Sequence, residues 1–145
     1  MTSLPITDLD PAEIEAAVAL WEACGLTRPW NDPRADARLA LAGATSTILA
    51  IREEDRLIAT AMVGADGHRG WVYYLAVAPD RRGEGLGEAV MRAAENWVRD
   101  RGLPKLQLMV RHENAVALGF YEAIGYKVEP TTVLSMRFEP DAGSR

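Results

Sequence analysis

The chain has 145 residues, of which 48% are hydrophobic and 26% charged, a balance that is typical of one globular domain and excludes a disordered chain. Its net charge of −5 argues against nucleic acid as the main partner, because phosphate binding requires a basic face. A single cysteine, Cys24, excludes an internal disulfide, and two histidines without a cysteine cluster argue against a metal site.

The first half of the chain predicts a strand, two helices and a hairpin. Asp10-Pro11-x-Glu13 indicates a helix start with Asp10 as the N-cap, and Gly25 ends that helix. The polar turn 53–56 between two apolar runs is typical of a hairpin. The predicted ranges are, in order, strand 3–7, helix 10–25, helix 32–42, strand 47–52 and strand 57–64.

The second half predicts alternating strands and helices. The run 71–77 is apolar on both alternating faces, so we expect it to be a central, buried strand. The predicted ranges are strand 71–77, helix 85–101, strand 105–111, helix 114–124 and strand 132–138. This order indicates an α+β (mixed α/β) fold in one domain over 1–139, and residues 140–145 are expected to form a flexible tail.

The turn from Arg82 to Gly87 carries the strongest signal of ligand binding. It joins the buried strand to a helix and contains three glycines, so successive N–H groups can point into one concavity. The start of a helix adds unpaired N–H groups, and Arg81 and Arg82 add positive charge. Together these features suit a diphosphate. A dinucleotide-binding turn would need glycine at Glu88, and a P-loop would need Gly-Lys-Ser/Thr, so neither motif is present.

The same residues resemble a known family. Arg82-x-x-Gly85-x-Gly87 is similar to the Arg/Gln-x-x-Gly-x-Gly/Ala motif of the GNAT acyltransferases, and Leu75-x-Val77-x-Pro79 looks like the strand end before that motif. The resemblance implies a GNAT fold, with a mixed central sheet of about six to seven strands flanked by about four helices. It also implies acetyl-CoA as the donor. The implied binding residues are Leu75, Ala76, Val77, Arg82, Gly83, Glu84, Gly85, Leu86, Gly87, Glu88, Asn114, Ala117 and Tyr121.

The helix 114–124 supplies a second half-site. At about 100° per residue, Asn114 and Tyr121 lie on one face, at the margin of an expected core stripe. That stripe consists of Val116, Phe120, Ala123 and Ile124. Asn114-x-x-Ala117-x-x-x-Tyr121-x-x-x-Gly125-Tyr126 is similar to the second GNAT motif, in which the tyrosine protonates the departing CoA thiolate and the asparagine contacts the pantetheine. The resemblance therefore implies that Tyr121 is catalytic.

Three further segments resemble the YpeA-like bacterial branch of the family. These segments are Leu20-Trp21-Glu22, Arg28-Pro29-Trp30-Asn31-Asp32-Pro33 and Asp66-Gly67-His68-Arg69-Gly70. The ribosomal-protein branch carries a glutamate in the strand before the second motif, and Met109 stands at that position here. The general base is therefore open, and Tyr73, Tyr74, Glu113 and His68 are the candidates.

The acceptor side is less defined. The segment after the first helix usually helps to form the acceptor pocket in this fold, so Arg28, Trp30 and Asn31 are candidates. Arg28 could hold a substrate carboxylate bidentately, whereas Asp32 is expected to cap the second helix. Substrate-side candidates are thus Arg28, Trp30, Asn31, His68, Tyr73, Tyr74 and Glu113.

Three functions fit these patterns. The leading hypothesis is an N-acetyltransferase that moves an acetyl group from acetyl-CoA directly to an amine of a small molecule or peptide. The alternatives are a non-catalytic acyl-CoA sensor on the same scaffold and a nucleotide-binding domain that uses the same turn. No secretory signal and no apolar run of about 18 residues is visible, so we expect a cytoplasmic protein without a membrane anchor, as a monomer or homodimer.

Overall fold

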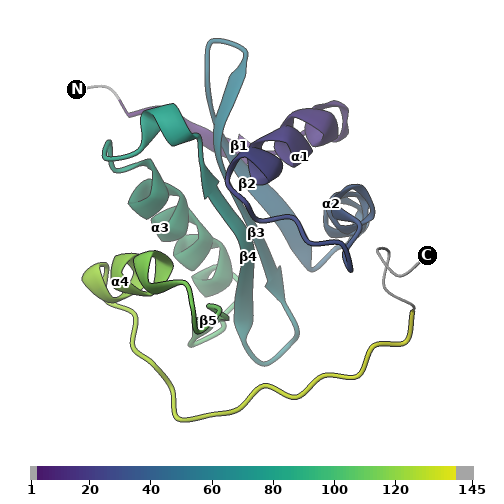
Figure 1. Ribbon diagram of the computed structural model, residues 1–145, viewed down its shortest axis with the longest axis vertical. Helices are drawn as coiled ribbons and strands as arrows, with labels where there is room; N and C mark the ends of the chain where they lie inside the picture. Colours follow the sequence, from purple (N-terminus) through teal and green to yellow (C-terminus); the bar gives the residue numbers. More distant parts are fainter. Residues whose placement is uncertain (1–2, 140–145) are drawn as a thin grey trace.

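The computed structural model describes residues 3–139, which form one mixed sheet with helices on both sides (Figure 1). The strands are β1 (Ile6–Asp8), β2 (Ser46–Glu53), β3 (Arg56–Ala65), β4 (Gly70–Val77) and β5 (Leu106–Leu108). The helices are α1 (Ile14–Ala23), α2 (Pro33–Ala42), α3 (Leu86–Arg99) and α4 (Ala115–Ala123), with 3-10 turns at Pro11–Glu13 and Pro79–Arg81. Each element predicted up to residue 124 is present. The predicted tail 140–145 lies outside the described residues.

The sheet has the strand order β1-β2-β3-β4-β5, antiparallel except for the parallel pair β4–β5. The α+β fold is confirmed, but the expected count of six to seven strands is wrong, since the sheet has five strands within residues 3–139. The strand expected at 132–138 is not formed. The chain after α4 runs as an extended arm along the outside of the molecule (Figure 1).

The arm explains why an apolar run did not become a strand. A strand needs a backbone partner, and no segment within residues 3–139 pairs with this one. Its apolar side chains are exposed, with Leu134 and Phe138 each at 89%. Arg137 ties the far end of the arm to the loop between α1 and α2, because its guanidinium donates to the Trp30 carbonyl and the Asn31 Oδ1 at 3.0 and 3.3 Å.

The two predicted helix starts in the first half are confirmed at the level of single atoms. Asp10 accepts from the Ala12 N–H at 2.8 Å while Glu13 accepts from the Asp10 N–H at 2.9 Å, which is a complete capping box. The Asp32 side chain accepts from Arg34 and Ala35 N–H groups at 3.1 Å, so Asp32 caps α2 as expected.

The core joins α1 to strands β3 and β4 of the sheet through Trp21, Thr60 and Tyr74. Trp21 of α1 is fully buried and stacks on Tyr74 of β4 with ring centroids 4.0 Å apart. Its indole N–H donates to the Thr60 hydroxyl at 2.9 Å, and that hydroxyl donates to the Tyr74 carbonyl at 3.0 Å. This chain of contacts fixes the position of Tyr74 relative to both β3 and α1.

β4 is irregular at Tyr74. Its pairing with β3 shifts register between Tyr73↔Met62 and Ala76↔Thr60, and Tyr74 has a φ of +52°. Such a φ is strained for a residue with a side chain, so the surrounding contacts hold it in place. This irregularity marks the point where β4 turns away from a regular ladder.

β5 is shorter than expected. The predicted strand 105–111 pairs with β4 only over Leu106–Leu108, opposite Gly70–Val72. Beyond these residues the two parallel strands separate, so the second half of β4 carries no strand on that edge among residues 3–139. The separation creates the opening that holds the candidate site. No described helix is long and apolar enough to cross a membrane.

Candidate active site

The turn from Arg82 to Glu88 presents a row of backbone donors. Gly83 and Gly85 have φ values of +81° and +83°, a conformation that glycine adopts without steric cost. Gly85 is the N-cap of α3, and the first bond of that helix runs from the Ala89 N–H to the Gly85 carbonyl. Within residues 3–139, the N–H groups from Arg82 to Glu88 have no acceptor, so they can hold an anionic ligand.

Arg81 and Arg82, at the start of this turn, have different roles. The Arg81 guanidinium binds Glu84 at 2.9 Å and Glu53 at 2.6 Å, and these two carboxylates hold its pKa above the usual range. Arg81 therefore ties the turn to β2 instead of offering free charge. Arg82 is exposed and forms no ion pair with the described residues, so it is the arginine that can meet a diphosphate.

The edge of β4 leads from the turn into the opening. Leu75 and Val77 are half-buried, whereas Ala76 points into the core and is 3% exposed. The Cys24 thiol donates to the Val77 carbonyl at 3.2 Å, so this carbonyl already has one partner. Leu75 lies on the wall of the cavity at this opening, within the stretch of β4 where the register shifts.

α4 places Tyr121 at the same opening. Its ring makes edge contacts with Phe120 and Tyr126, with centroids 5.1 and 5.8 Å away. Burial raises the pKa of Tyr121 to about 12, so the phenol stays protonated at neutral pH. Tyr121 lines the cavity, and no group among the described residues forms a hydrogen bond with its hydroxyl.

Asn114 caps α4, and only half of the apolar stripe predicted for this helix packs on the core. The Asn114 side chain accepts from the Ala117 N–H at 3.1 Å and so caps α4 while lining the cavity. The expected stripe is half wrong: Phe120 and Ile124 pack on the core, but Val116 is 86% exposed and Ala123 is also exposed. Among residues 3–139, α4 packs on the core through Phe120, Tyr121 and Ile124, and no described strand covers its outer face.

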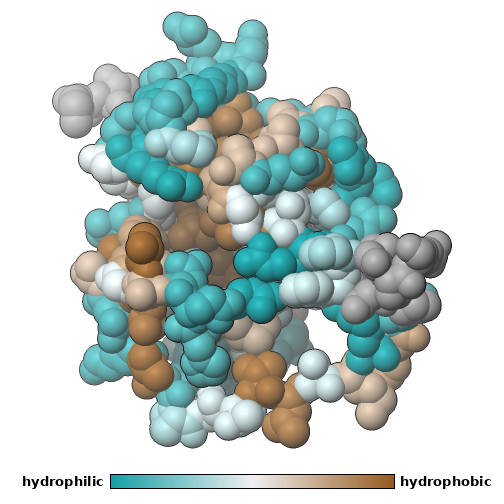
Figure 2. Space-filling model, in the orientation of Figure 1, coloured by the Kyte–Doolittle hydropathy of each residue, from teal (hydrophilic) through white to brown (hydrophobic). Residues whose placement is uncertain are grey.

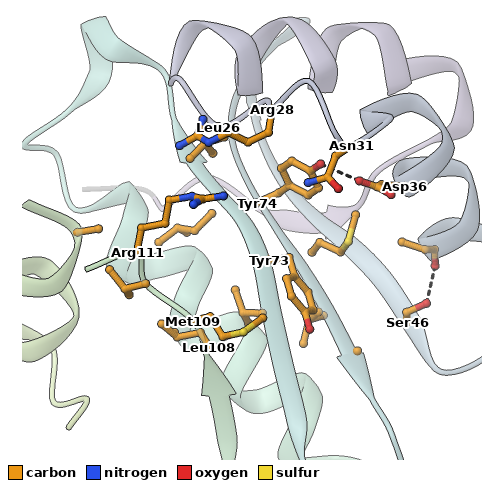
Figure 3. A pocket seen from close by; sticks show the side chains of 18 of the residues that line it. Leu26, Arg28, Asn31, Asp36, Ser46, Tyr73, Tyr74, Leu108, Met109 and Arg111 are labelled. Atoms are coloured by element: carbon orange, nitrogen blue, oxygen red, sulfur yellow. Dashed lines mark hydrogen bonds between the residues drawn. The ribbon is translucent and has the colours of Figure 1, made fainter. Parts of the chain in front are cut away.

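The opening is a cavity of about 650 Å³ between the α1–α2 loop, β4 and the β5–α4 loop. Figure 2 shows a hollow on this face, with apolar side chains in its depth and hydrophilic ones at its rim. Residues predicted for the donor side and residues predicted for the acceptor side both line it, and Figure 3 labels those of the acceptor side. From the donor side the lining includes Leu75, Asn114, Ala117 and Tyr121, and from the acceptor side Arg28, Asn31, Tyr73 and Tyr74.

The remaining predicted residues lie elsewhere. The turn 82–88 lies outside the cavity lining, as do His68, Glu113 and Trp30. His68 is exposed in the β3–β4 turn, where its backbone N–H donates to Asp66 at 2.8 Å. Trp30 lies beside a residue of the cavity lining, since the Arg111 guanidinium is 5.3 Å from its ring centroid.

Two charged side chains of the cavity were missed from the sequence. Asp36 of α2 accepts a hydrogen bond from the Tyr74 hydroxyl at 2.8 Å, and burial together with this carboxylate holds the Tyr74 pKa above its usual range. Arg111 enters from the β5–α4 loop. The sequence places Asp36 one helical turn after the Asp32 cap, which could have suggested that its carboxylate points inward. The direction of that carboxylate is nevertheless decided by how α2 packs on the sheet.

Comparison with known proteins identifies close relatives. Residues 15–126 match the model of the acetyltransferase (GNAT) family. An acetyltransferase of Yersinia enterocolitica is 38% identical over 130 residues, which cover 90% of this chain and 92% of that protein. One of Pectobacterium atrosepticum is 39% identical over 129 residues, with 89% and 92% coverage.

Solved structures share the fold. A putative acetyltransferase from Agrobacterium tumefaciens superposes with a TM-score of 0.76 at 20% identity, covering 92% of this chain and 99% of that one. AAC(6')-Iy, in complex with a bisubstrate analogue that contains CoA, has a TM-score of 0.78 at 16% identity, covering 95% and 99%.

Proposed function

The chain belongs to the acetyltransferase (GNAT) family and is an acyltransferase that uses acetyl-CoA, and from this premise we propose that it transfers the acetyl group directly to an amine bound in the cavity beside β4. The acceptor is an amine of a small molecule or peptide. The observation that carries the proposal is that Leu75, Asn114 and Tyr121 line one cavity with Tyr74 and Arg28.

The donor fits the residues that are present. The free N–H groups from Arg82 to Glu88, with Arg82, would hold the diphosphate, since they are donors without acceptors among residues 3–139. The unpaired edge of β4 from Leu75 to Val77 would bind the pantetheine arm as an added strand. Acetyl-CoA supplies the activated acetyl group as a thioester.

The transfer requires two proton movements. As the nitrogen–carbon bond forms, the carbon–sulfur bond breaks and the sulfur leaves with the electron pair. Tyr121 donates its phenolic proton to that sulfur and is reprotonated from solvent. Moving a proton from a phenol of pKa about 12 to the thiolate of a free thiol of pKa about 8.5 costs about 5 kcal/mol. The half-buried setting reduces this cost, because it disfavours the charged thiolate as it disfavours the charged phenolate.

The amine must lose a proton on the other side of the cavity. Tyr74 is an unsuitable base, because its hydroxyl already donates to Asp36 and its pKa is raised. The pKa of Tyr73 is raised as well, by burial and by the charge of Asp66. We therefore assign the proton to the Asp36 carboxylate, directly or through a water molecule. His68 and Glu113 are outside the cavity lining, which places them away from this role.

The sensor alternative rests on one observation. Met109 lines the cavity and is 50% exposed where the ribosomal-protein branch carries a glutamate, so a base at that position is missing. Asp36 offers a carboxylate from another element, which favours the enzyme.

The test combines binding with turnover. A thermal-shift competition among acetyl-CoA, ATP and NAD should show stabilisation by acetyl-CoA alone, and a screen of amines should show thiol release above the rate of hydrolysis. Stabilisation by acetyl-CoA without thiol release from any amine would favour the sensor. Stabilisation by ATP or NAD instead would favour a nucleotide-binding domain.

A further inference from the structure

The acceptor half of the cavity has an unusual charge pattern for a protein of net charge −5. The charged side chains among its lining residues are Arg28, Arg111 and Asp36. Two positive groups thus enter from the α1–α2 and β5–α4 loops, and a single carboxylate enters from α2 (Figure 3). A surplus of positive charge inside an acidic protein calls for an anionic partner.

Arg28 is held in place by backbone groups instead of by a carboxylate. One of its nitrogens, Nη1, donates to the carbonyls of Gly25 and Thr27 at 2.7 and 3.0 Å. Within residues 3–139 it forms no ion pair, and its Nε and Nη2 have no acceptor there. The bonds to the loop reduce the side chain's freedom, so its remaining donors are oriented before a ligand binds.

Arg111 reaches the same part of the cavity from the opposite wall. It lies in the β5–α4 loop, and its guanidinium is 5.3 Å from the centroid of the Trp30 ring, two residues along the chain from Arg28. No carboxylate of the described residues lies within ion-pair distance of it. Figure 3 shows the Arg28 and Arg111 side chains extending toward one region beside Tyr74.

The opposite side of the cavity is suited to an ammonium group. Asp36 accepts from the Tyr74 hydroxyl at 2.8 Å, which leaves further lone pairs of the carboxylate available. Tyr74 precedes Leu75, where the edge of β4 proposed to bind the pantetheine arm begins, so an amine near Asp36 would be close to the acetyl end of that arm.

We propose that the acceptor is a small amine that carries a carboxylate, whose carboxylate is bound between Arg28 and Arg111 while its amine faces Asp36. The inference rests on the proposed acetyl transfer and adds the class of acceptor. It excludes polycationic amines as good substrates, since two guanidinium groups would repel them. A cavity of about 650 Å³, shared with the donor arm, has room for a molecule of amino-acid size.

The test is a paired acceptor screen with the full-length protein and acetyl-CoA. Each amino acid, together with β-alanine and γ-aminobutyrate, is compared with its own carboxamide, and kanamycin serves as a polycationic amine. Tripeptide amides that begin with Asp or Glu carry the carboxylate in a peptide. We expect at least one free amino acid to react with a kcat/KM about tenfold or more above its amide.

Two variants locate the carboxylate site. Arg111→Gln changes an exposed side chain, and Arg28→Lys keeps the charge while removing the fork of donors. For the preferred acceptor, each should lower kcat/KM about 10- to 100-fold through KM, while the KM for acetyl-CoA changes less than about threefold. Arg38→Gln, on the exposed side of α2, removes the same charge and should leave both values unchanged.

The possible failures differ from one another. The carboxylate site would be overturned, with acetyl transfer intact, if amides or kanamycin reacted as fast as the free amino acids or faster. It would also be overturned if Arg111→Gln raised the KM for acetyl-CoA instead of the KM for the acceptor. Saturable binding of an amino acid that Arg111→Gln abolishes, with no thiol release, would support the carboxylate site and overturn the proposed function. Binding of neither kind of amine would overturn both.

Discussion

Replacing Tyr121 with phenylalanine removes the proposed acid and leaves the packing of α4 in place. The hydroxyl has no hydrogen-bond partner among residues 3–139, and the ring contacts with Phe120 and Tyr126 do not involve it. We therefore expect the free energy of unfolding to change by less than about 0.5 kcal/mol. The affinity for acetyl-CoA should also stay within about twofold.

Turnover should respond strongly to the same substitution. A positioned general acid contributes about 10²- to 10⁴-fold, so kcat should fall by at least about 100-fold in Tyr121→Phe. Because burial raises the pKa of Tyr121 to about 12, the acid form persists throughout the accessible range. The wild type should thus show no alkaline loss of kcat from this group below about pH 11, since activity declines only as the pH rises through that pKa.

Tyr126, just beyond the C-terminal end of α4, offers a matched control. Tyr126 contacts Tyr121 edge-on, and its hydroxyl donates to Glu95 at 2.7 Å. Tyr126→Phe should cost about 1–2 kcal/mol of stability but leave kcat within about threefold. The assay is thiol release under saturating acetyl-CoA, with urea unfolding for stability. A kcat for Tyr121→Phe within twofold of wild type, or an equal loss in both variants, would refute the acid role.

Four further substitutions test the donor turn and the core beneath the site. Arg82→Gln should weaken acetyl-CoA binding several-fold in calorimetry without lowering the melting temperature. Arg81→Gln should lower the melting temperature, because Arg81 binds two carboxylates. The reverse pattern would contradict the different roles assigned to the two arginines. Gly85→Ala should destabilise the protein by about 1 kcal/mol and weaken acetyl-CoA binding, since the added Cβ meets open space but the φ of +83° is strained for alanine. Thr60→Val should cost about 1–3 kcal/mol in urea unfolding, because the buried Trp21 indole loses its acceptor; an unchanged stability would show that this bond is dispensable.

The donor side could be predicted because its signals are local. The turn 82–88 is one continuous segment, and its glycines adopt the conformation that the motif requires. Asn114 and Tyr121 lie on one helix, so their spacing alone places them near each other. The capping residues Asp10 and Asp32 were predictable for the same reason.

The acceptor side depends on contacts between distant segments. Arg28, Asp36 and Arg111 come from a loop, a helix and a second loop, and only the packing of these elements brings them to one cavity. The last strand was mispredicted because the run 132–138 has strand-like composition, while pairing requires a partner that the pattern does not reveal. The outer face of α4 was mispredicted because no segment of residues 3–139 covers it, so Val116 stays exposed.

The most direct test of the account follows the acetyl group itself. The protein is incubated with acetyl-CoA that carries a deuterated acetyl group and with the best acceptor from the screen, and the products and the intact protein are analysed by mass spectrometry. Direct transfer predicts label on the acceptor nitrogen in an amount equal to the CoA released, with none retained on the protein. Label that accumulates on Cys24, or acetyl-CoA that binds and remains intact, would contradict direct transfer to an amine.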